Sequence, residues 1–156
     1  KEAIKEFKQA GYRVVIVSNQ AGIARGLYGP SDVDRLHLFV QQQLACIGTS
    51  VDAFYYCPHH TAHGENRSCE CRKPKPGMLL EAAKALNIDL ARSWLVGDKL
   101  TDLFAGQAIG VKGVLVQTGY GKQELSHLGP GYLTVADLPA AASLIIQGAY
   151  KTEGRT

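Results

Sequence analysis

Four residues of the kinds that bind soft metal ions form two close pairs near the middle of the chain. The first pair is Cys57-Pro58-His59, and the second is Cys69-Glu70-Cys71, with nine residues between them. Zinc prefers tetrahedral coordination by thiolate sulfur and imidazole nitrogen, and two ligand pairs that close one loop commonly form structural zinc sites. Disulfides that include the remaining cysteine, Cys46, or incidental buried thiols are the alternatives. The histidine and the isolated position of Cys46 favour a reduced zinc site with four ligands: Cys57, His59, Cys69 and Cys71. His60 and His63 flank the cluster and are the alternatives to His59.

A cationic loop follows the second pair directly, with the sequence Arg72-Lys73-Pro74-Lys75-Pro76-Gly77. An arginine guanidinium can bind an oxyanion through two parallel hydrogen bonds, and a lysine ammonium places a compact charge beside a phosphoryl group. A solvated run of charges is the usual alternative. Because two prolines stiffen the loop and the adjacent metal site would hold it in place, the pattern predicts an anion-binding loop.

Two further polar segments follow apolar runs. Ser18-Asn19-Gln20 comes after the β-branched run 12–17, and a segment from Gly97 to Asp102 comes after Trp94-Leu95-Val96. A hydroxyl group beside backbone amides can cradle phosphate oxygens, and the carboxylates of Asp98 and Asp102 are ligands of the kind that Mg²⁺ takes. A simple polar turn in the first segment and helix capping in the second are the alternatives. Each segment alone is a weak motif.

The elements that would position these segments alternate along the chain. We expect a first helix that ends near Gly11, strands at 12–17, 53–56, 94–97 and 113–117, and further helices at 31–44, 77–86, 101–109 and 138–150. This order predicts an α/β fold, a Rossmann-like doubly wound parallel sheet with right-handed crossovers. Ligands of such sheets bind beyond the carboxyl ends of the strands, where all the polar segments would lie. We expect one domain over residues 1–150 and a flexible tail over 151–156.

Composition argues against several classes of function. The chain has 156 residues, 46% of them hydrophobic, and a formal net charge of +3. Because its Lys and Arg residues are scattered, nucleic-acid binding receives little support, and no apolar run approaches the roughly 18–20 residues of a membrane span. We therefore expect a soluble, cytoplasmic monomer that acts on a small molecule, without a nucleic-acid or membrane partner. We also expect Cys46 to be a buried apolar residue.

Taken together, these loops resemble the haloacid dehalogenase superfamily of phosphotransferases. Ser18 matches its second motif, Lys73 its third, and Gly97-Asp98 with Asp102 its fourth. The cysteine–histidine cluster narrows the resemblance to the branch of D-glycero-D-manno-heptose 1,7-bisphosphate 7-phosphatases and histidinol phosphatases. The segments 18–26, 55–60 and 71–79, together with Lys99 where histidinol phosphatases tend to carry Arg, resemble the heptose family. The similarity extends from the first helix to Leu138 or beyond.

The resemblance implies a phosphatase without a cap domain that removes the 7-phosphate of a small phosphorylated sugar. Such an activity serves nucleotide-heptose synthesis for the lipopolysaccharide core. The reaction would pass through a phospho-aspartate, with Mg²⁺ bound partly by Asp98 and the phosphoryl group stabilised by Ser18 and Lys73. Asp102 would support the site from behind, and the zinc would be structural because four protein ligands leave no open position. The implied substrate-binding residues are Ser18, Asn19, Gln20, Ala21, Arg72, Lys73 and Lys99.

One part of the family pattern is not found in this sequence. The superfamily has a central first strand that ends in Asp-x-Asp and provides the nucleophile and the general acid/base. The Asp32-Val33-Asp34 segment follows Gly29-Pro30-Ser31 at an expected helix start, where acidic residues complement the helix dipole, so it does not fit this role. We expect the natural protein to have a further ~25–35 residues that supply the strand. The alternatives are a histidinol-phosphate phosphatase, an inactive zinc-binding fragment, and a zinc-stabilised nucleic-acid module.

Overall fold

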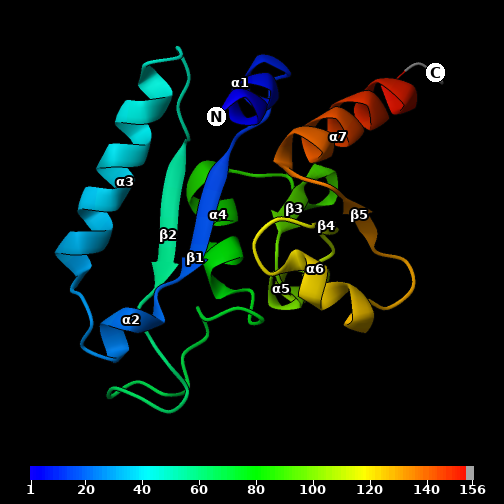
Figure 1. Cartoon of the computed structure of the whole chain (residues 1–156). Coiled ribbons are helices and arrows are strands. Elements are labelled where there is room, and N and C mark those ends of the chain that lie inside the picture. Colours follow the sequence, from blue (N-terminus) through cyan, green and yellow to red (C-terminus); the bar gives the residue numbers. More distant parts are fainter. Residues whose placement is uncertain (154–156) are drawn as a thin grey trace.

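Five parallel strands form the framework of the protein. The structure is a computed structural model that describes residues 1–153 and the side chains of residues 1–148. β1 (Val15–Asn19) pairs with β2 (Ala53–Cys57), with Val15 opposite Ala53. β3 (Trp94–Gly97), β4 (Lys112–Val116) and β5 (Leu133–Val135) form a second sheet in that order. Because all the pairs are parallel, the carboxyl ends of the strands lie at one edge of each sheet (Figure 1). This arrangement confirms the predicted α/β class with parallel strands.

Helices connect the strands and cover the sheets (Figure 1). Each connection between consecutive strands contains at least one helix, which leaves room for the crossover that parallel pairing requires. The helices are α1 (Glu2–Gln9), α2 (Ala21–Ala24), α3 (Pro30–Ala45), α4 (Gly77–Leu86), α5 (Leu100–Gln107), α6 (Gly121–Glu124) and α7 (Leu138–Glu153), with short 3₁₀ turns at Leu90–Arg92 and Leu125–His127.

The main core lies on the two faces of β4. Val114 and Val116 pack with Ala3 and Phe7 of α1 and with Ile145 of α7. Leu115 points to the opposite face, where it packs with Leu100 and Leu103 of α5. This alternation follows from the period of two residues along a strand. Both faces of β4 are therefore covered, as expected for a strand inside a doubly wound sheet.

β1 and β3 are much less covered than their sequences predict. Residues 15–17 of β1 and 94–96 of β3 are apolar, yet every residue of both strands is only partly buried, whereas Val114 and Leu115 of β4 are 0% exposed. Within residues 1–153, β1 and β3 each pair with a neighbour on one side only. A cavity of about 980 Å³ runs between the residues of these two strands and continues between helices α1, α4 and α7. We refer to the part of this cavity between β1 and β3 as the strand slot.

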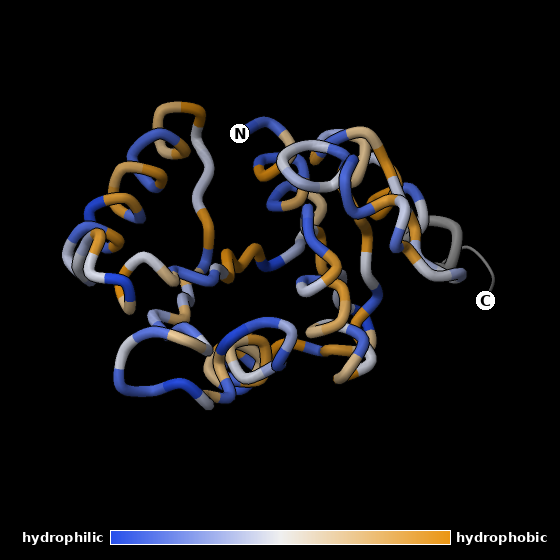
Figure 2. Tube along the Cα trace, turned by 60° about the horizontal axis from the view of Figure 1, so that its bottom comes forward, coloured by the Kyte–Doolittle hydropathy of each residue, from blue (hydrophilic) through white to orange (hydrophobic). Residues whose placement is uncertain are grey.

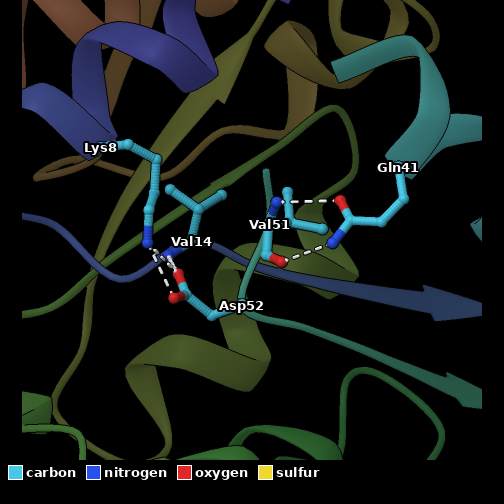
Figure 3. A network of polar contacts seen from close by, with 5 residues as sticks. All are labelled: Lys8, Val14, Gln41, Val51 and Asp52. Atoms are coloured by element: carbon cyan, nitrogen blue, oxygen red, sulfur yellow. Dashed lines mark hydrogen bonds and ion pairs between the residues drawn. The ribbon is translucent and has the colours of Figure 1, made fainter. Parts of the chain in front are cut away.

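A polar network fixes the start of the pairing between β1 and β2 (Figure 3). The Asp52 carboxylate accepts hydrogen bonds from the Val14 N–H at 2.6 Å and from Lys8 Nζ at 2.7 Å. The Gln41 side chain of α3 donates to the carbonyl of Val51 at 2.9 Å and accepts from its N–H at 3.0 Å. These contacts tie α1 and α3 to the residues just before β2, and they satisfy backbone groups that the sheet does not pair.

α3 packs on β2 through one face and exposes apolar side chains on another. The His37 ring stacks on Phe54, with ring centroids 4.3 Å apart, while Leu36, Leu38 and Phe39 are at least half exposed. Figure 2 shows this helix as alternating hydrophilic and hydrophobic segments. Across the described part of the chain, no helix combines the length and the apolar character that crossing a membrane would need.

Several predicted elements occur with the expected bounds, and others differ. The helix at 77–86 and the strand at 94–97 are confirmed. The first strand is shifted and includes Ser18 and Asn19, which were expected in a loop, because their backbone continues the ladder opposite Tyr56 and Cys57. The short elements α2 and β5 were not predicted, since neither has a periodic apolar pattern.

Three further predictions concern Cys46, the Asp32-Val33-Asp34 segment and the C-terminal tail. Cys46 is exposed rather than buried, because it lies at the end of α3 beyond the packed part of the helix. Asp32 accepts a hydrogen bond from the Gly29 N–H at 2.7 Å in the first turn of α3, which confirms that Asp32-Val33-Asp34 belongs to a helix start. The last helix continues to Glu153, and residues 154–156 of the predicted tail lie outside the described residues.

Asp52 should make the stability of the fold depend on pH. Burial alone would raise the pKa of Asp52, but the hydrogen bonds from Lys8 and Val14 outweigh it and hold this pKa below its ordinary value of 3.8. A lowered pKa means that the stabilisation is complete above pH ~4 and is lost as the pH falls through the folded-state pKa. We expect Asp52→Asn to lower the free energy of unfolding by about 1 kcal/mol at pH 7, and by much less at pH 3.

Urea denaturation at both pH values measures this difference. Glu6→Gln removes a carboxylate from the exposed side of α1 and serves as the control, with an expected change within about 0.5 kcal/mol. An effect of Asp52→Asn that is the same at pH 7 and pH 3 would contradict the prediction.

Candidate active site

Lys73 lies at the centre of the polar residues at the carboxyl ends of the strands. Its ammonium donates to the Val17 carbonyl of β1 at 2.8 Å and pairs with Asp102 Oδ1 of α5 at 2.8 Å. The two side chains of this ion pair are only 10% and 11% exposed. Since a lysine ammonium has three N–H donors, one donor is left after these two contacts. Lys73 can therefore offer a fixed positive charge and one hydrogen bond to an anion in the cavity.

Asn19 holds the backbone of Lys73 in place. Its Nδ2 donates to the Lys73 carbonyl at 3.0 Å, and its Oδ1 accepts from the Lys73 N–H at 3.1 Å. Two hydrogen bonds between one amide and one residue restrict both the position and the orientation of that residue. Asn19 also lines the cavity, and its side-chain amide holds the cationic loop beside β1. Its contact with substrate stays a prediction.

Ser18 and Gln20 form a second polar group next to Lys73. Gln20 Nε2 donates to Ser18 Oγ at 3.1 Å, and Gln20 Oε1 accepts from the Tyr28 hydroxyl at 2.8 Å. This chain fixes the serine oxygen while its own hydroxyl hydrogen can still rotate. Ser18 thus keeps a donor for a ligand oxygen, whereas the Gln20 side chain supports it from behind.

Asp98 and Asp102 follow β3 and make different contacts. Asp98 Oδ2 accepts from the Tyr120 N–H at 3.0 Å, and Asp102 Oδ2 accepts from the Lys99 N–H at 3.1 Å. The Lys99 ammonium lies 3.9 Å from the centre of the Tyr120 ring, within range of a cation–π interaction. Asp102 therefore caps α5 and pairs with Lys73, while Asp98 is held by the loop after β4 and keeps Oδ1 for another partner.

The predicted residues come together in one place, with one exception. The cavity that contains the strand slot opens at the carboxyl ends of β1 and β3. Gln20 is not among the residues that line it. The predicted residues that do line it are Ser18, Asn19, Ala21, Arg72, Lys73, Asp98, Lys99 and Asp102.

The cysteine–histidine cluster has the dimensions of a tetrahedral metal site. Its four candidate ligand atoms all lie within 4.8 Å of one another. Cys57 Sγ lies 3.6 Å from Cys69 Sγ, and His59 Nδ1 lies 3.3 Å from Cys71 Sγ. Zn–S bonds of about 2.3 Å and Zn–N bonds of about 2.0 Å in a tetrahedron place the ligand atoms about 3.5–3.8 Å apart. A disulfide would need about 2.05 Å between the sulfurs. The spacing therefore fits metal coordination and not disulfides.

The three thiols of this cluster differ in acidity. Burial raises the pKa of Cys57 and, together with hydrogen bonds from the other two thiols, that of Cys71. Burial would also raise the pKa of Cys69, but hydrogen bonds from the Cys71 thiol and the Arg72 backbone outweigh it and lower the pKa to about 7. Because metals bind thiolates, a divalent ion entering this cluster displaces protons, and acid opposes its binding.

Comparisons with known proteins place this site in a class. The HAD-hyrolase-like family matches residues 70–141, which include Lys73, Asp98 and Asp102. The fold and the site thus define a hydrolase of the haloacid dehalogenase type, which confirms the resemblance.

More similar proteins specify the family. A D-glycero-β-D-manno-heptose-1,7-bisphosphate 7-phosphatase of Pasteurella multocida is 46% identical over 143 residues, covering 88% of this chain and 78% of that protein. The enzyme of the same name from Pseudomonas aeruginosa is 41% identical and covers 94% and 80%. The crystal structure of a D,D-heptose 1,7-bisphosphate phosphatase from B. bronchiseptica, complexed with magnesium and phosphate, has a TM-score of 0.85 at 39% identity and covers 94% and 81%. The chain belongs to the D-glycero-β-D-manno-heptose-1,7-bisphosphate 7-phosphatase family.

The loop at Gly119 and Tyr120 is part of the site although the sequence did not indicate it. Gly119-Tyr120-Gly121-Lys122 resembles a phosphate-binding loop only superficially, because it lacks the Walker spacing. Its actual contact is the Tyr120 N–H on Asp98. A backbone N–H donor cannot be recognised from the sequence, because every residue except proline has one. The only sequence signal is Gly119, which has φ +56° and lies so close to Asp98 that an added Cβ would collide with the carboxylate.

Gly119→Ala should therefore destabilise the protein. The left-handed backbone costs a non-glycine residue about 1–2 kcal/mol, and the new Cβ must also displace Asp98. We expect a loss of at least about 1 kcal/mol in the free energy of unfolding, measured by urea denaturation. Gly129→Ala is the matched control, because an added Cβ at Gly129 meets nothing within 4 Å. Equal stability of the two variants would contradict the prediction.

Proposed function

We propose that the protein is a phosphatase that removes the 7-phosphate of D-glycero-β-D-manno-heptose 1,7-bisphosphate. The observation that carries this proposal is the convergence of Ser18, Lys73 and Asp98 at the mouth of one cavity, in a chain 46% identical to a protein with that named activity. Lys99 after Asp98 favours this substrate over histidinol phosphate, as the family pattern implies.

The residues at the cavity mouth suit the stabilisation of a transferring phosphoryl group. Negative charge on its equatorial oxygens is best met by donors that are already in place. The Lys73 ammonium is fixed by Val17 and Asp102, and the Ser18 oxygen is fixed by Gln20. Neither donor atom needs to move when the charge develops, and only the Ser18 O–H needs to rotate.

The residues present fit a magnesium ion next to this group. Mg²⁺ prefers oxygen ligands, keeps several waters, and is usually bound through one or two carboxylates and a substrate phosphate. Asp98 offers Oδ1 at the mouth of the cavity, because its other oxygen is occupied by Tyr120. When bound, the ion would balance charge on the phosphoryl oxygens.

The strand slot suits an additional parallel strand between β1 and β3. Such a strand would pair the backbone groups at the open edges of β1 and β3, whose exposure is otherwise costly. Its carboxyl end would reach Ser18, Lys73 and Asp98. An Asp-x-Asp at that end, as the resemblance implies, would provide the nucleophile of the phospho-aspartate route and the general acid/base.

Phosphate release tests the activity. We expect the full-length protein with Mg²⁺ to hydrolyse the heptose bisphosphate with kcat/KM at least tenfold above that for histidinol phosphate. Asp98→Asn keeps an oxygen for the Tyr120 N–H but removes the charge, so kcat/KM should fall by about 10²–10³-fold. Asp34→Asn, on the exposed side of α3, is the control and should change nothing measurable. No hydrolysis of either substrate by the unmodified protein would refute the proposal, and preference for histidinol phosphate would favour the alternative.

We further propose that the cysteine–histidine cluster binds one structural zinc ion. Four protein ligands complete the tetrahedron, so the ion would hold the loop between β2 and α4 rather than activate water. We expect one zinc per chain by elemental analysis, and Cys69→Ser should lose most of it together with thermal stability. Cys46→Ser, which removes an exposed thiol outside the cluster, should retain full zinc content. Equal zinc content in the two variants would argue against the site.

A further inference from the structure

Tyr28 lies between α2 and α3, beyond the carboxyl end of β1 (Figure 1). The chain turns back after α2, because the Leu27 N–H donates to the Gly22 carbonyl at 2.9 Å and Gly26 takes a left-handed conformation with φ +70°. This turn places the Tyr28 ring against α2, where a Cβ added at Gly22 would collide with it. The turn and the contact with Gly22 thus hold the ring, although 37% of the residue is exposed.

The Tyr28 hydroxyl begins a chain of hydrogen bonds that ends at Ser18. It donates to Gln20 Oε1 at 2.8 Å, and Gln20 Nε2 donates to Ser18 Oγ at 3.1 Å. The Gln20 backbone is held as well, because its N–H donates to the Cys57 carbonyl at 2.8 Å. Ser18 lines the cavity, whereas Gln20 and Tyr28 are not among the residues that line it. Both side chains therefore act on a ligand in the cavity only through the serine.

The direction of this chain decides what Ser18 offers to the cavity. A serine hydroxyl has one hydrogen to donate and two lone pairs that accept. In the observed orientation the serine oxygen accepts from Gln20 Nε2, so its hydrogen is free for an oxygen atom in the cavity. If the Gln20 amide turned by 180°, Oε1 would take that hydrogen. Ser18 would then offer only lone pairs, which repel an anion.

Tyr28 favours the observed orientation of the amide. A phenolic hydroxyl donates more strongly than it accepts, because one of its lone pairs is delocalised into the ring. It therefore binds the amide oxygen of Gln20 better than the amide nitrogen. Hydrogen bonds in a chain also polarise one another, which strengthens the last donor when it faces a charged oxygen. Loss of the Tyr28 hydroxyl would remove both effects and let Gln20 Oε1 compete for the Ser18 hydrogen.

We propose that Tyr28 is a positioning residue that keeps Ser18 a hydrogen-bond donor to the transferring phosphoryl group. This inference rests on the proposed function, in which Ser18 stabilises negative charge on the phosphoryl oxygens. Tyr28 acts through Gln20, touches no reacting atom and exchanges no proton with the substrate. Because the chain supports a donor that acts as charge develops, its loss should lower kcat more than it changes KM.

A double-mutant cycle tests this role in the full-length protein. We expect Tyr28→Phe to lower kcat for the heptose bisphosphate by about 3- to 10-fold, the effect of one neutral hydrogen bond, with KM within about twofold. In a Ser18→Ala background the same change should have no further effect, because the chain no longer ends at a donor. Tyr132→Phe is the matched control and should leave kcat unchanged. Its hydroxyl also donates to a glutamine, Gln107, and neither residue lines the cavity.

A purely structural role of Tyr28 predicts a different result. If Tyr28→Phe lowers kcat by the same factor with and without Ser18→Ala, the tyrosine does not act through the serine. The inference is then refuted while the proposed function stands. Gln20→Met removes the middle of the chain with little change in volume and provides a second background, in which Tyr28→Phe should again have no effect. An undiminished effect in that background also refutes the inference.

Calorimetric titration with orthovanadate and Mg²⁺ provides a measurement that needs no hydrolysis. Orthovanadate takes the five-coordinate geometry of a phosphoryl group in transfer, so it should depend on the Ser18 donor as the transition state does. We expect Tyr28→Phe to weaken vanadate binding by about 3- to 10-fold, but not in the Ser18→Ala background. This result supports the role of Tyr28 even if the unmodified protein hydrolyses neither substrate, which refutes only the proposed function. Vanadate affinity that Tyr28→Phe leaves unchanged, or no vanadate binding by the unmodified protein, refutes the inference.

Discussion

The two sheets of this protein are joined at their polar edge by the contacts of a single lysine ammonium. Lys73 donates to Val17 of β1 and pairs with Asp102 of α5, which packs against β3 and β4. A buried charge is costly unless it is paired and hydrogen-bonded, so the ammonium holds these partners at fixed positions. The anion-binding geometry on both sides of the strand slot therefore depends on one ion pair.

The rest of the site supports the position of this lysine. Asn19 fixes its backbone from β1, and the metal cluster ends two residues before it, at Cys71. A metal bound there would restrict the loop from its other side, since the ligands come from both β2 and the segment before α4. Rigid placement is what electrostatic stabilisation requires, because donors that must reorganise lose much of their effect. The cationic loop is thus held by Asn19 at Lys73 and would be held by a bound metal at Cys71.

The slot between β1 and β3 and the site at its mouth are physically linked. A strand placed there would bury the half-exposed faces of both strands and bring its carboxyl end beside Lys73 and Asp98. Insertion of that strand would then complete the sheet and bring the reacting groups together in the same step.

The sequence by itself determined the residue types and the order of the elements. The ligand pairs around His59, the cationic loop at Lys73, the helix at 77–86 and the strand at 94–97 are all local patterns, and local patterns follow from apolar periodicity and ligand chemistry. Tertiary structure decided which atoms meet. Lys73 and Val17 are 56 residues apart, Tyr120 reaches Asp98 through its backbone, and the Asn19 amide binds the backbone of Lys73, 54 residues away. Contacts between distant segments depend on how the sheets and helices pack, and a backbone donor carries no mark in residue type, so the spacing of residues along the chain cannot specify them.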